Sequence, residues 1–248
     1  MAQEVFKRYE KKYMLNKEQY QMLLSRILPR MLPDEYGNYT ICNIYFDTPD
    51  YALIRTSLEK PIYKEKLRLR SYGIPASSDT VFVEMKKKFR GVVYKRRVAM
   101  SLEKANGYLY QGIHPEVSGQ IMQELNWFTE RYSLLPAVYL AYDRVAYSSR
   151  EDPGLRVTFD TGIRYRENQL TLEHGDSGNL LLPEHNVLME IKIPGVMPLW
   201  LAHTLSDLSV YPTSFSKYGT YYMQKAAGNT LLPKNYNDSE QNSIFLLS

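Results

Sequence analysis

Charged residues recur at every second position in several short runs of this chain. Arg68 with Arg70 is one such pair, and Glu84 with Lys86 is another. Arginine presents a planar fork of N–H donors that fits phosphate oxygens, and carboxylates are oxygen ligands for Mg²⁺ or Mn²⁺. The pattern therefore predicts chemistry on a phosphate-rich anion. The residues that carry it are Arg8, Glu10, Lys12, Lys66, Arg68, Arg70, Glu84, Lys86, Lys95, Arg97, Tyr142, Arg144, Arg156, Glu190 and Lys192.

This two-residue spacing is that of a β-strand, whose side chains alternate between two faces. The charged residues of each run share one face, opposite apolar neighbours such as Leu67, Leu69 and Val83. An ordinary sheet with one solvated face explains any single strand of this kind. Across the set, however, the charged face is mostly basic. If helices cover the apolar face, the charged face closes inward, and a buried basic lining needs an anion.

Three glutamates precede a lysine by two positions, in Glu10-x-Lys12, Glu84-x-Lys86 and Glu190-x-Lys192. Each pair points to one side of its strand. One interpretation is a salt bridge along the strand, which is common. The other is a set of oxygen ligands for a divalent metal that bridges to phosphate.

Composition limits the class of protein. The chain has 248 residues, of which 44% are apolar and 23% are charged, as in a globular protein with a sizeable core. Its 22 tyrosines favour a sheet-rich fold, and its net charge of +4 is too small to indicate nucleic-acid binding by itself. With one cysteine, no signal peptide pattern and no membrane-spanning run, we expect a soluble cytoplasmic protein.

The elements that must position the charged residues follow from periodicity and from turn residues. We expect one domain over residues 1–227 and a loosely ordered tail over 228–248. Pro33 and Gly37 predict a loop, and so do residues 173–183. Predicted strands are Glu4–Leu15, Tyr39–Asp47, Tyr63–Tyr72, Thr80–Lys88, Val92–Met100, Ala137–Ser148, Leu155–Asp160, continuing over Gly162–Asn168, and Asn186–Ile193. Predicted helices are Lys17–Leu28, Pro49–Leu58, one opening at Ser101–Lys104, Pro115–Tyr132, Pro198–Leu208 and Ser216–Ala227.

Several motifs together resemble the triphosphate tunnel metalloenzymes, and more closely the VTC domain, a polyphosphate polymerase module. The resemblance spans about residues 6–222. The matching motifs are Arg8-Tyr-Glu-Lys-Lys-Tyr13, Asn43-Ile-Tyr-Phe-Asp-Thr48, Lys66-Leu-Arg-Leu-Arg-Ser-Tyr-Gly73, Phe82-Val-Glu-Met-Lys86, Tyr142-Asp-Arg144, Leu155-Arg-Val-Thr-Phe-Asp-Thr161, Met189-Glu-Ile-Lys192 and Phe215-Ser-Lys-Tyr218.

The resemblance implies an α+β fold, with a closed eight-stranded antiparallel β tunnel and helices packed outside. It also implies Mn²⁺ or Mg²⁺ as cofactor, ATP as substrate and polyphosphate as product. Phosphates would be gripped by Lys12, Arg68, Arg70, Lys86, Arg144, Arg156 and Lys217, with further contacts from Arg8, Lys66, Lys95, Arg97, Tyr142, Lys192 and Ser216. Glu190 would hold the metal, with Glu10 and Glu84 as further candidate ligands.

One departure from the wider superfamily bears on the reaction. Its hydrolytic members typically begin with Glu-x-Glu-x-Lys, whereas this chain has Arg8-x-Glu10-x-Lys12. Fewer carboxylates leave fewer places for a second, water-activating metal, which favours a polymerase. The alternatives are a metal-dependent hydrolase of inorganic or organic triphosphates and a non-catalytic polyphosphate sensor. RNA is disfavoured because no stacking platform accompanies the basic strands, and docking to a separate membrane protein is left open.

Overall fold

A computed structural model describes residues 9–90, 92–116, 119–152 and 154–228. Its main feature is one antiparallel sheet, with strands β1 (Tyr9–Leu15), β2 (Met31–Asp47), β3 (Tyr63–Tyr72), β4 (Thr80–Phe89), β5 (Val92–Ser101), β6 (Leu135–Ser149), β7 (Arg156–Arg166) and β9 (Val187–Ile193). Two-residue strands, β8 (Asn179–Leu180) and β10 (Pro212–Thr213), extend it. The order is β10-β1-β9-β7-β6-β2-β3-β4-β5, with β8 beside β7.

Local chemistry explains where the first helix begins and ends. Helix α1 (Lys17–Ile27) starts after Asn16, whose side chain accepts from the Gln19 amide, and Pro29 follows in a short 3-10 turn. The other helices are α2 (Ala52–Leu58), α3 (Leu102–Gln111), α4 (Gln120–Arg131), α5 (Leu199–Asp207) and α6 (Lys217–Ala226). None of the helices in the described ranges is long and apolar enough to cross a membrane.

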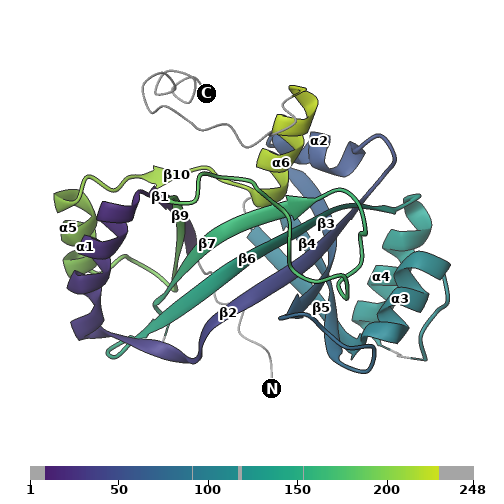
Figure 1. The fold of residues 1–248 in the computed structure, drawn as a ribbon, viewed down its shortest axis with the longest axis horizontal. Helices are drawn as coiled ribbons and strands as arrows, with labels where there is room; N and C mark the ends of the chain where they lie inside the picture. Colours follow the sequence, from purple (N-terminus) through teal and green to yellow (C-terminus); the bar gives the residue numbers. More distant parts are fainter. Residues whose placement is uncertain (1–8, 91, 117–118, 153, 229–248) are drawn as a thin grey trace.

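Three apolar clusters attach these helices to the sheet (Figure 1). One joins α3 and α4 to β2–β4 around Leu67 and Phe128. Another joins α1 and α5 to β1, β7 and β9 around Tyr13 and Leu23. The third lies under α2 and α6, around Tyr45 and Tyr218. Because the first two clusters occupy the apolar side of the charged strands, the charged side faces inward, as predicted.

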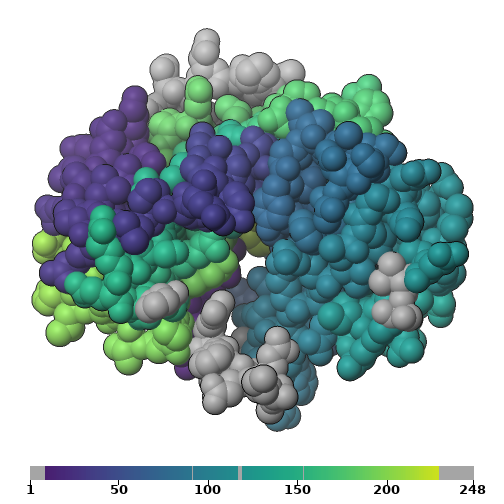
Figure 2. All heavy atoms as spheres, turned by 90° about the horizontal axis from the view of Figure 1, so that it is seen from below, coloured from purple at the N-terminus to yellow at the C-terminus, as the bar shows by residue number. Residues whose placement is uncertain are grey.

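The sheet curls into a trough rather than a ring closed by hydrogen bonds. Edge strand β5 pairs with β4, and β1 pairs with β9 and β10, but no ladder joins β5 to β1 among the described residues. Eight long strands are present as predicted, but their predicted closure is not seen. Figure 2 shows a hollow between the body that carries β1 and the one that carries β3–β5.

Some predicted boundaries are wrong. The predicted loop at Pro33 and Gly37 lies within β2, which begins at Met31 because it pairs with the far end of β6, with an irregularity between Pro33 and Asn38. Helix α4 starts at Gln120 rather than at Pro115. Predictions for residues 4–8, including Arg8, and for residues 229–248 lie outside the described ranges.

Candidate functional site: a cationic trough

Cross-strand register brings the charged positions into one continuous row on the inner face. Glu190 of β9 pairs with Lys12 on one side and with Thr158 on the other, and Arg144 pairs with Asp160. Across the trough, Arg68 of β3 pairs with Glu84, which pairs with Arg97 of β5. Opposite residues in antiparallel strands lie within about 5.5 Å of one another. The alternation read from the sequence therefore assembles one lining from eight strands.

The first group of charges surrounds Glu84, and we call it the Glu84 cluster: Glu84, Arg68, Arg70 and Lys95. Arg68 donates from Nε and Nη2 to Glu84 Oε2 at 2.8 and 2.6 Å, and Lys95 Nζ lies 2.7 Å from Oε1. Arg70 Nη1 lies 3.7 Å from Oε2. Burial opposes ionisation of Glu84, but these cations outweigh it and lower its pKa to about 2. One buried carboxylate thus organises three cations.

Two neutral side chains also accept hydrogen bonds from Arg68 and Arg70 and help to orient them. Asn43 Oδ1 accepts from Arg70 Nε at 2.9 Å, and the Tyr45 hydroxyl accepts from Arg68 Nη1 at 3.2 Å. Burial would raise the pKa of Tyr45, but Arg68, Arg70 and Lys66 lower it to about 8. Both partners come from β2, whose register places Asn43 opposite Arg70 and Tyr45 opposite Arg68.

The second group, the Glu190 cluster, consists of Glu190, Asp160, Lys12, Arg144 and Lys217. Arg144 makes a bidentate contact with Asp160 at 2.6 and 2.7 Å, and Lys217 Nζ lies 2.6 Å from Asp160 Oδ2. Glu190 lies farther from its partners, at 3.4 Å from Lys12, 3.5 Å from Arg144 and 3.9 Å from Lys217. Against the effect of burial, Lys217, Lys12 and Arg144 lower the pKa of Glu190 well below its ordinary value.

Several lysines of the lining have no carboxylate partner. Among the described residues Lys66, Lys86 and Lys192 form no ion pair within 4.0 Å. Burial lowers the pKa of all three, and neighbouring Lys64, Lys86 and Lys12 contribute to a value of about 8 for Lys66. Buried cations that repel one another are stabilised by an anionic ligand. These lysines are therefore positions that an anionic ligand would stabilise.

A short segment crosses the trough between its walls, and we call residues 212–217 the strap. Lys12 Nζ on β1 donates to the Phe215 carbonyl at 3.0 Å, and Lys66 Nζ on β3 donates to Ser216 Oγ at 3.2 Å. The strap leads into α6, whose N-cap Ser216 accepts from the Gly219 amide. Lys217 Nζ lies 4.1 Å from the centre of the Tyr142 ring, which is part of the lining. Lys217 is the first residue of α6, so the start of a helix, where backbone amides favour anions, lies at the trough.

Packing fixes the position of α6. The Tyr218 hydroxyl donates to the buried Asp47 at 2.7 Å, and its ring stacks on Tyr45 at 4.8 Å between centroids. Asp47 also accepts from the Leu53 and Ile54 amides of α2. A side chain at position 219 would meet Leu58 at 3.1 Å, so Gly219 allows α6 to approach α2 closely.

The remaining predicted residues divide between the lining and its margins. Tyr142 lies in the lining, where its hydroxyl accepts from Arg70 Nη2 at 3.4 Å, and Arg97 stacks over Phe82 at 4.3 Å. Arg156 lies at a margin with its side chain 43% exposed, 2.7 Å from Asp34. Glu10 is also at a margin, 3.8 Å from Lys12.

The three predicted metal ligands are not brought together. Among the described residues no three His, Cys, Asp or Glu side chains are grouped to hold a metal. Glu84 accepts hydrogen bonds at short distance, whereas Glu190 makes only the longer ion pairs given above. Mg²⁺ is often bound by one or two carboxylates plus substrate phosphates. Glu190 fits such a metal, shared with a phosphate ligand.

Sequence reasoning missed several partners within the site. Alternation puts Asp160 on the same strand face as Arg156, but the sequence assigns it no role, although it holds Arg144 and Lys217. Asn43 and Tyr45 belong to a recognised motif, and their alternation with Ile44 is the signal that could have placed them inward. Nothing in the local sequence around Asp34 or Phe215 indicates their contacts, which depend on the long β2 and on the strap.

The curled antiparallel sheet and its cationic inner face resemble those of the triphosphate tunnel proteins. A family model described as the VTC domain matches residues 7–224. The chain therefore belongs to the VTC domain family. A search of curated proteins found no match.

Two solved structures are similar to this chain at low identity, and the first of them shares its fold. A "putative adenylate cyclase" from Bacillus halodurans is 17% identical, with 84% of this chain and 92% of that chain covered and a TM-score of 0.53. A "putative adenylyl cyclase" from Hippeastrum, described as having a dominant triphosphatase activity, is 15% identical, with coverages of 92% and 99% and a TM-score of 0.47.

Proposed function

We propose that this protein is a polyphosphate polymerase, which transfers the terminal phosphate of ATP to the end of a polyphosphate chain within the trough. The observation that carries the proposal is the excess of buried cations on the inner face. The Glu84 and Glu190 clusters each hold more cations than carboxylates, and Lys66, Lys86 and Lys192 have no carboxylate partner among the described residues. A lining of this kind suits a long anion better than a small one.

The residues would act by positioning and by neutralising charge, as phosphoryl transfer requires. The Glu84 cluster on one wall and Lys12, Arg144 and Lys217 on the other would hold adjoining phosphates. The end phosphate of the acceptor is already anionic, so it needs alignment and relief from repulsion rather than a general base. A divalent metal shared by Glu190 and the phosphates would supply further charge neutralisation.

Hydrolysis of a triphosphate is the second candidate function. It is favoured by the open side of the trough between β1 and β5, because this opening admits water. A binding module without turnover would use the same cations. Closure of the trough around a bound chain would exclude water and favour transfer, so closure belongs to the polymerase proposal.

The test is incubation of the purified protein with ATP and Mn²⁺ or Mg²⁺, with and without a short polyphosphate primer, followed by gel separation. We expect long chains and ADP. Free phosphate without chains would assign the protein as a hydrolase. Binding of polyphosphate without turnover, seen as a raised melting temperature, would assign it as a sensor.

Substitution of Arg68 or Arg70 by Ala should lower synthesis by about 10²-fold, the usual effect of losing one donor to the reacting group. Arg131→Ala is the matched control, because Arg131 lies on α4 and stacks over Trp127 outside the trough. Thermal unfolding identifies variants that fail to fold, and Arg68→Lys retains a cation beside Glu84. Full synthesis by folded Arg68→Ala and Arg70→Ala would contradict the proposal.

A further inference from the structure

One end of the β3–β4–β5 wall exposes apolar and basic side chains together. We call it the hairpin tip and define it as Lys60–Lys64, Lys88–Arg90 and Val92–Tyr94. Its exposed apolar or aromatic residues are Ile62 (66% exposed), Tyr63, Phe89, Val93 (48%) and Tyr94. Its cations are Lys60, Lys64, Lys88 and Arg90, and the three segments contain no Asp or Glu.

Backbone pairing holds these residues in a fixed arrangement. Tyr63 pairs with Phe89, Lys64 pairs with Lys88, and the Arg90 amide donates to the Ile62 carbonyl at 2.9 Å. The rings of Tyr63 and Phe89 meet edge to face at 6.5 Å, and the Arg90 guanidinium lies 5.3 Å from the centre of the Phe89 ring. The tip is therefore an ordered surface at the end of three strands.

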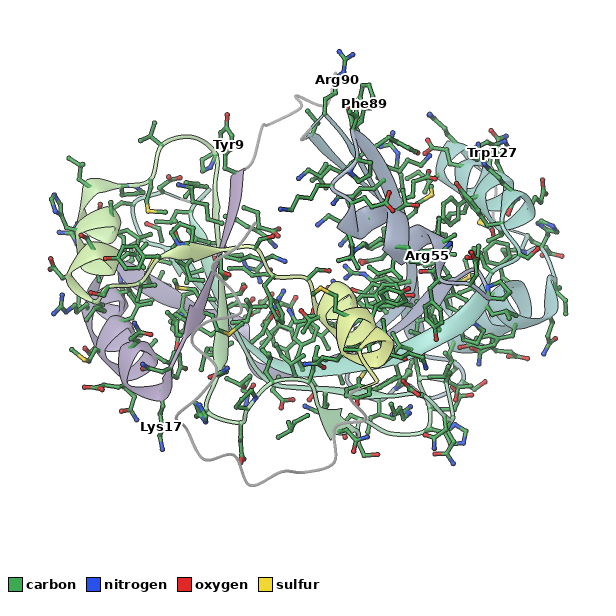
Figure 3. All side chains as sticks on the ribbon, turned by 90° about the horizontal axis from the view of Figure 1, so that it is seen from above. Tyr9, Lys17, Arg55, Phe89, Arg90 and Trp127 are labelled. Carbon is green, nitrogen blue, oxygen red and sulfur yellow. The ribbon has the colours of Figure 1, made fainter. Side chains whose placement is uncertain are left out.

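The exposed apolar side chains of the tip, rather than its charge, distinguish it from the phosphate lining, because Lys64 and Lys88 lie on the same strand face as Lys66 and Lys86. Figure 3 shows Phe89 and Arg90 at an outer extreme of the molecule, pointing away from its body. None of the four cations of the tip forms an ion pair with a described residue, whereas nearby Lys87 and Arg96 both pair with Glu124. Single exposed apolar residues are ordinary, but here Tyr63, Phe89 and Tyr94 share one strand face and Val93 lies on the other. A protruding end that exposes apolar side chains on both faces marks an interaction site.

We propose that the hairpin tip binds an anionic lipid bilayer. Aromatic and aliphatic side chains flanked by Lys and Arg suit the membrane interface, where apolar groups enter between headgroups and cations contact lipid phosphates. The convex tip can enter a bilayer surface, whereas a protein partner would have to supply an acidic apolar hollow of matching shape. The proposal is independent of the reaction in the trough.

The test is co-sedimentation of the full chain with two kinds of vesicle, phosphatidylcholine alone and phosphatidylcholine with an equal amount of phosphatidylglycerol. We expect binding to the mixed vesicles only. Arg90→Glu should weaken it by at least about fivefold, the effect of one cation near an anionic surface. Phe89→Ser, which keeps the charge, should weaken it several-fold.

Matched controls are Lys17→Glu, an exposed cation on α1, and Val196→Ser, an apolar side chain that is 94% exposed. Neither should change vesicle binding. Binding of tripolyphosphate should be unchanged in both tip variants, which shows that the fold and the trough are intact. Because Cys42 is buried, an environment-sensitive dye can be attached to Phe89→Cys, and its emission should shift on binding mixed vesicles, unlike that of a dye on Val196→Cys.

Three outcomes would overturn the proposal. The first is no binding to mixed vesicles. The second is vesicle binding that is unchanged in Phe89→Ser and Arg90→Glu but abolished in Arg70→Ala. This result would show that lipid headgroups bind in the trough and not at the tip. The third is an effect of the tip variants on self-association in gel filtration without vesicle binding, which would assign the tip to a protein contact.

Discussion

At the scale of single residues, the trough balances cations against a few buried carboxylates. Glu84 has a side-chain exposure of 2% and is surrounded by Arg68, Arg70 and Lys95. Breaking a buried ion pair from one side typically costs about 3–5 kcal/mol, because the partner charges are left uncompensated. Glu84 therefore stabilises the empty trough and also spreads its cations for a ligand.

Glu84→Gln should lower the free energy of unfolding by about 3 kcal/mol at neutral pH. The pKa of Glu84 is about 2 in the fold and about 4.3 in an unfolded chain. Its stabilisation is thus present above the unfolded value and is lost as the pH falls towards 2. Urea unfolding at several pH values should show a weaker acid dependence in the variant, and polyphosphate should stabilise the variant more than the wild type. Equal stability at neutral pH would contradict this account.

Lys66 should make ligand binding depend on alkaline pH. Its pKa is about 8, so it is charged below this pH and neutral above it. Affinity for tripolyphosphate should therefore fall roughly tenfold as the pH rises through about 8, the effect of losing one charge-assisted hydrogen bond. Titration calorimetry should show a smaller change for Lys66→Arg.

Tyr45, whose pKa is also about 8, would add a negative charge over the same range. The positive charges of Lys64, Lys86 and Lys12 also lower the pKa of Lys66. Tyr45→Phe separates the two groups, since it should retain the part of the pH dependence that belongs to Lys66. A dependence that survives Lys66→Arg in full and vanishes in Tyr45→Phe would assign the effect to the tyrosine.

At the scale of elements, the strap couples helix α6 to the lining. Ser216 is both the N-cap of α6 and the partner of Lys66. Ser216→Ala should lower the free energy of unfolding by about 1 kcal/mol through the lost cap, and it should also weaken tripolyphosphate binding. Ser101→Ala removes the N-cap of α3 outside the trough and should lower stability without changing affinity. Equal affinity in both variants would separate the strap from the ligand site.

The strands and helices also show how much of the structure could be predicted from the sequence. Alternation predicted which side of β3 and β4 carries Arg68, Arg70 and Glu84, because the period of a strand is local. It could not predict that β2 begins at Met31 or that the register of β6 and β7 shifts between Ala141 and Asp143, since both depend on pairing with distant strands. The Lys12 contact with Phe215, which links positions 203 residues apart, likewise follows only from the assembled fold.

At the scale of the whole molecule, the two walls of the trough are joined through β7, β6 and β2 on one side only. On the other side β1 and β5 share no ladder among the described residues, and the strap supplies the cross-links through Lys12 and Lys66. Each wall carries a cation that forms no ion pair with a described residue, Lys192 on one wall and Lys86 on the other. An anion that contacts both should draw the walls together, because it replaces repulsion between them by attraction.

Spin labels on Tyr9→Cys and Phe89→Cys can measure this movement, because these residues flank the opening in Figure 3 and Cys42 is buried. Polyphosphate should shorten the distance between the labels and narrow its distribution. A control pair on Tyr72→Cys and Phe89→Cys, within the β3–β4 wall, should not change. If the distance across the opening stays the same while polyphosphate binds with normal affinity, the trough is rigid. Exclusion of water during transfer would then have to come from the bound chain alone.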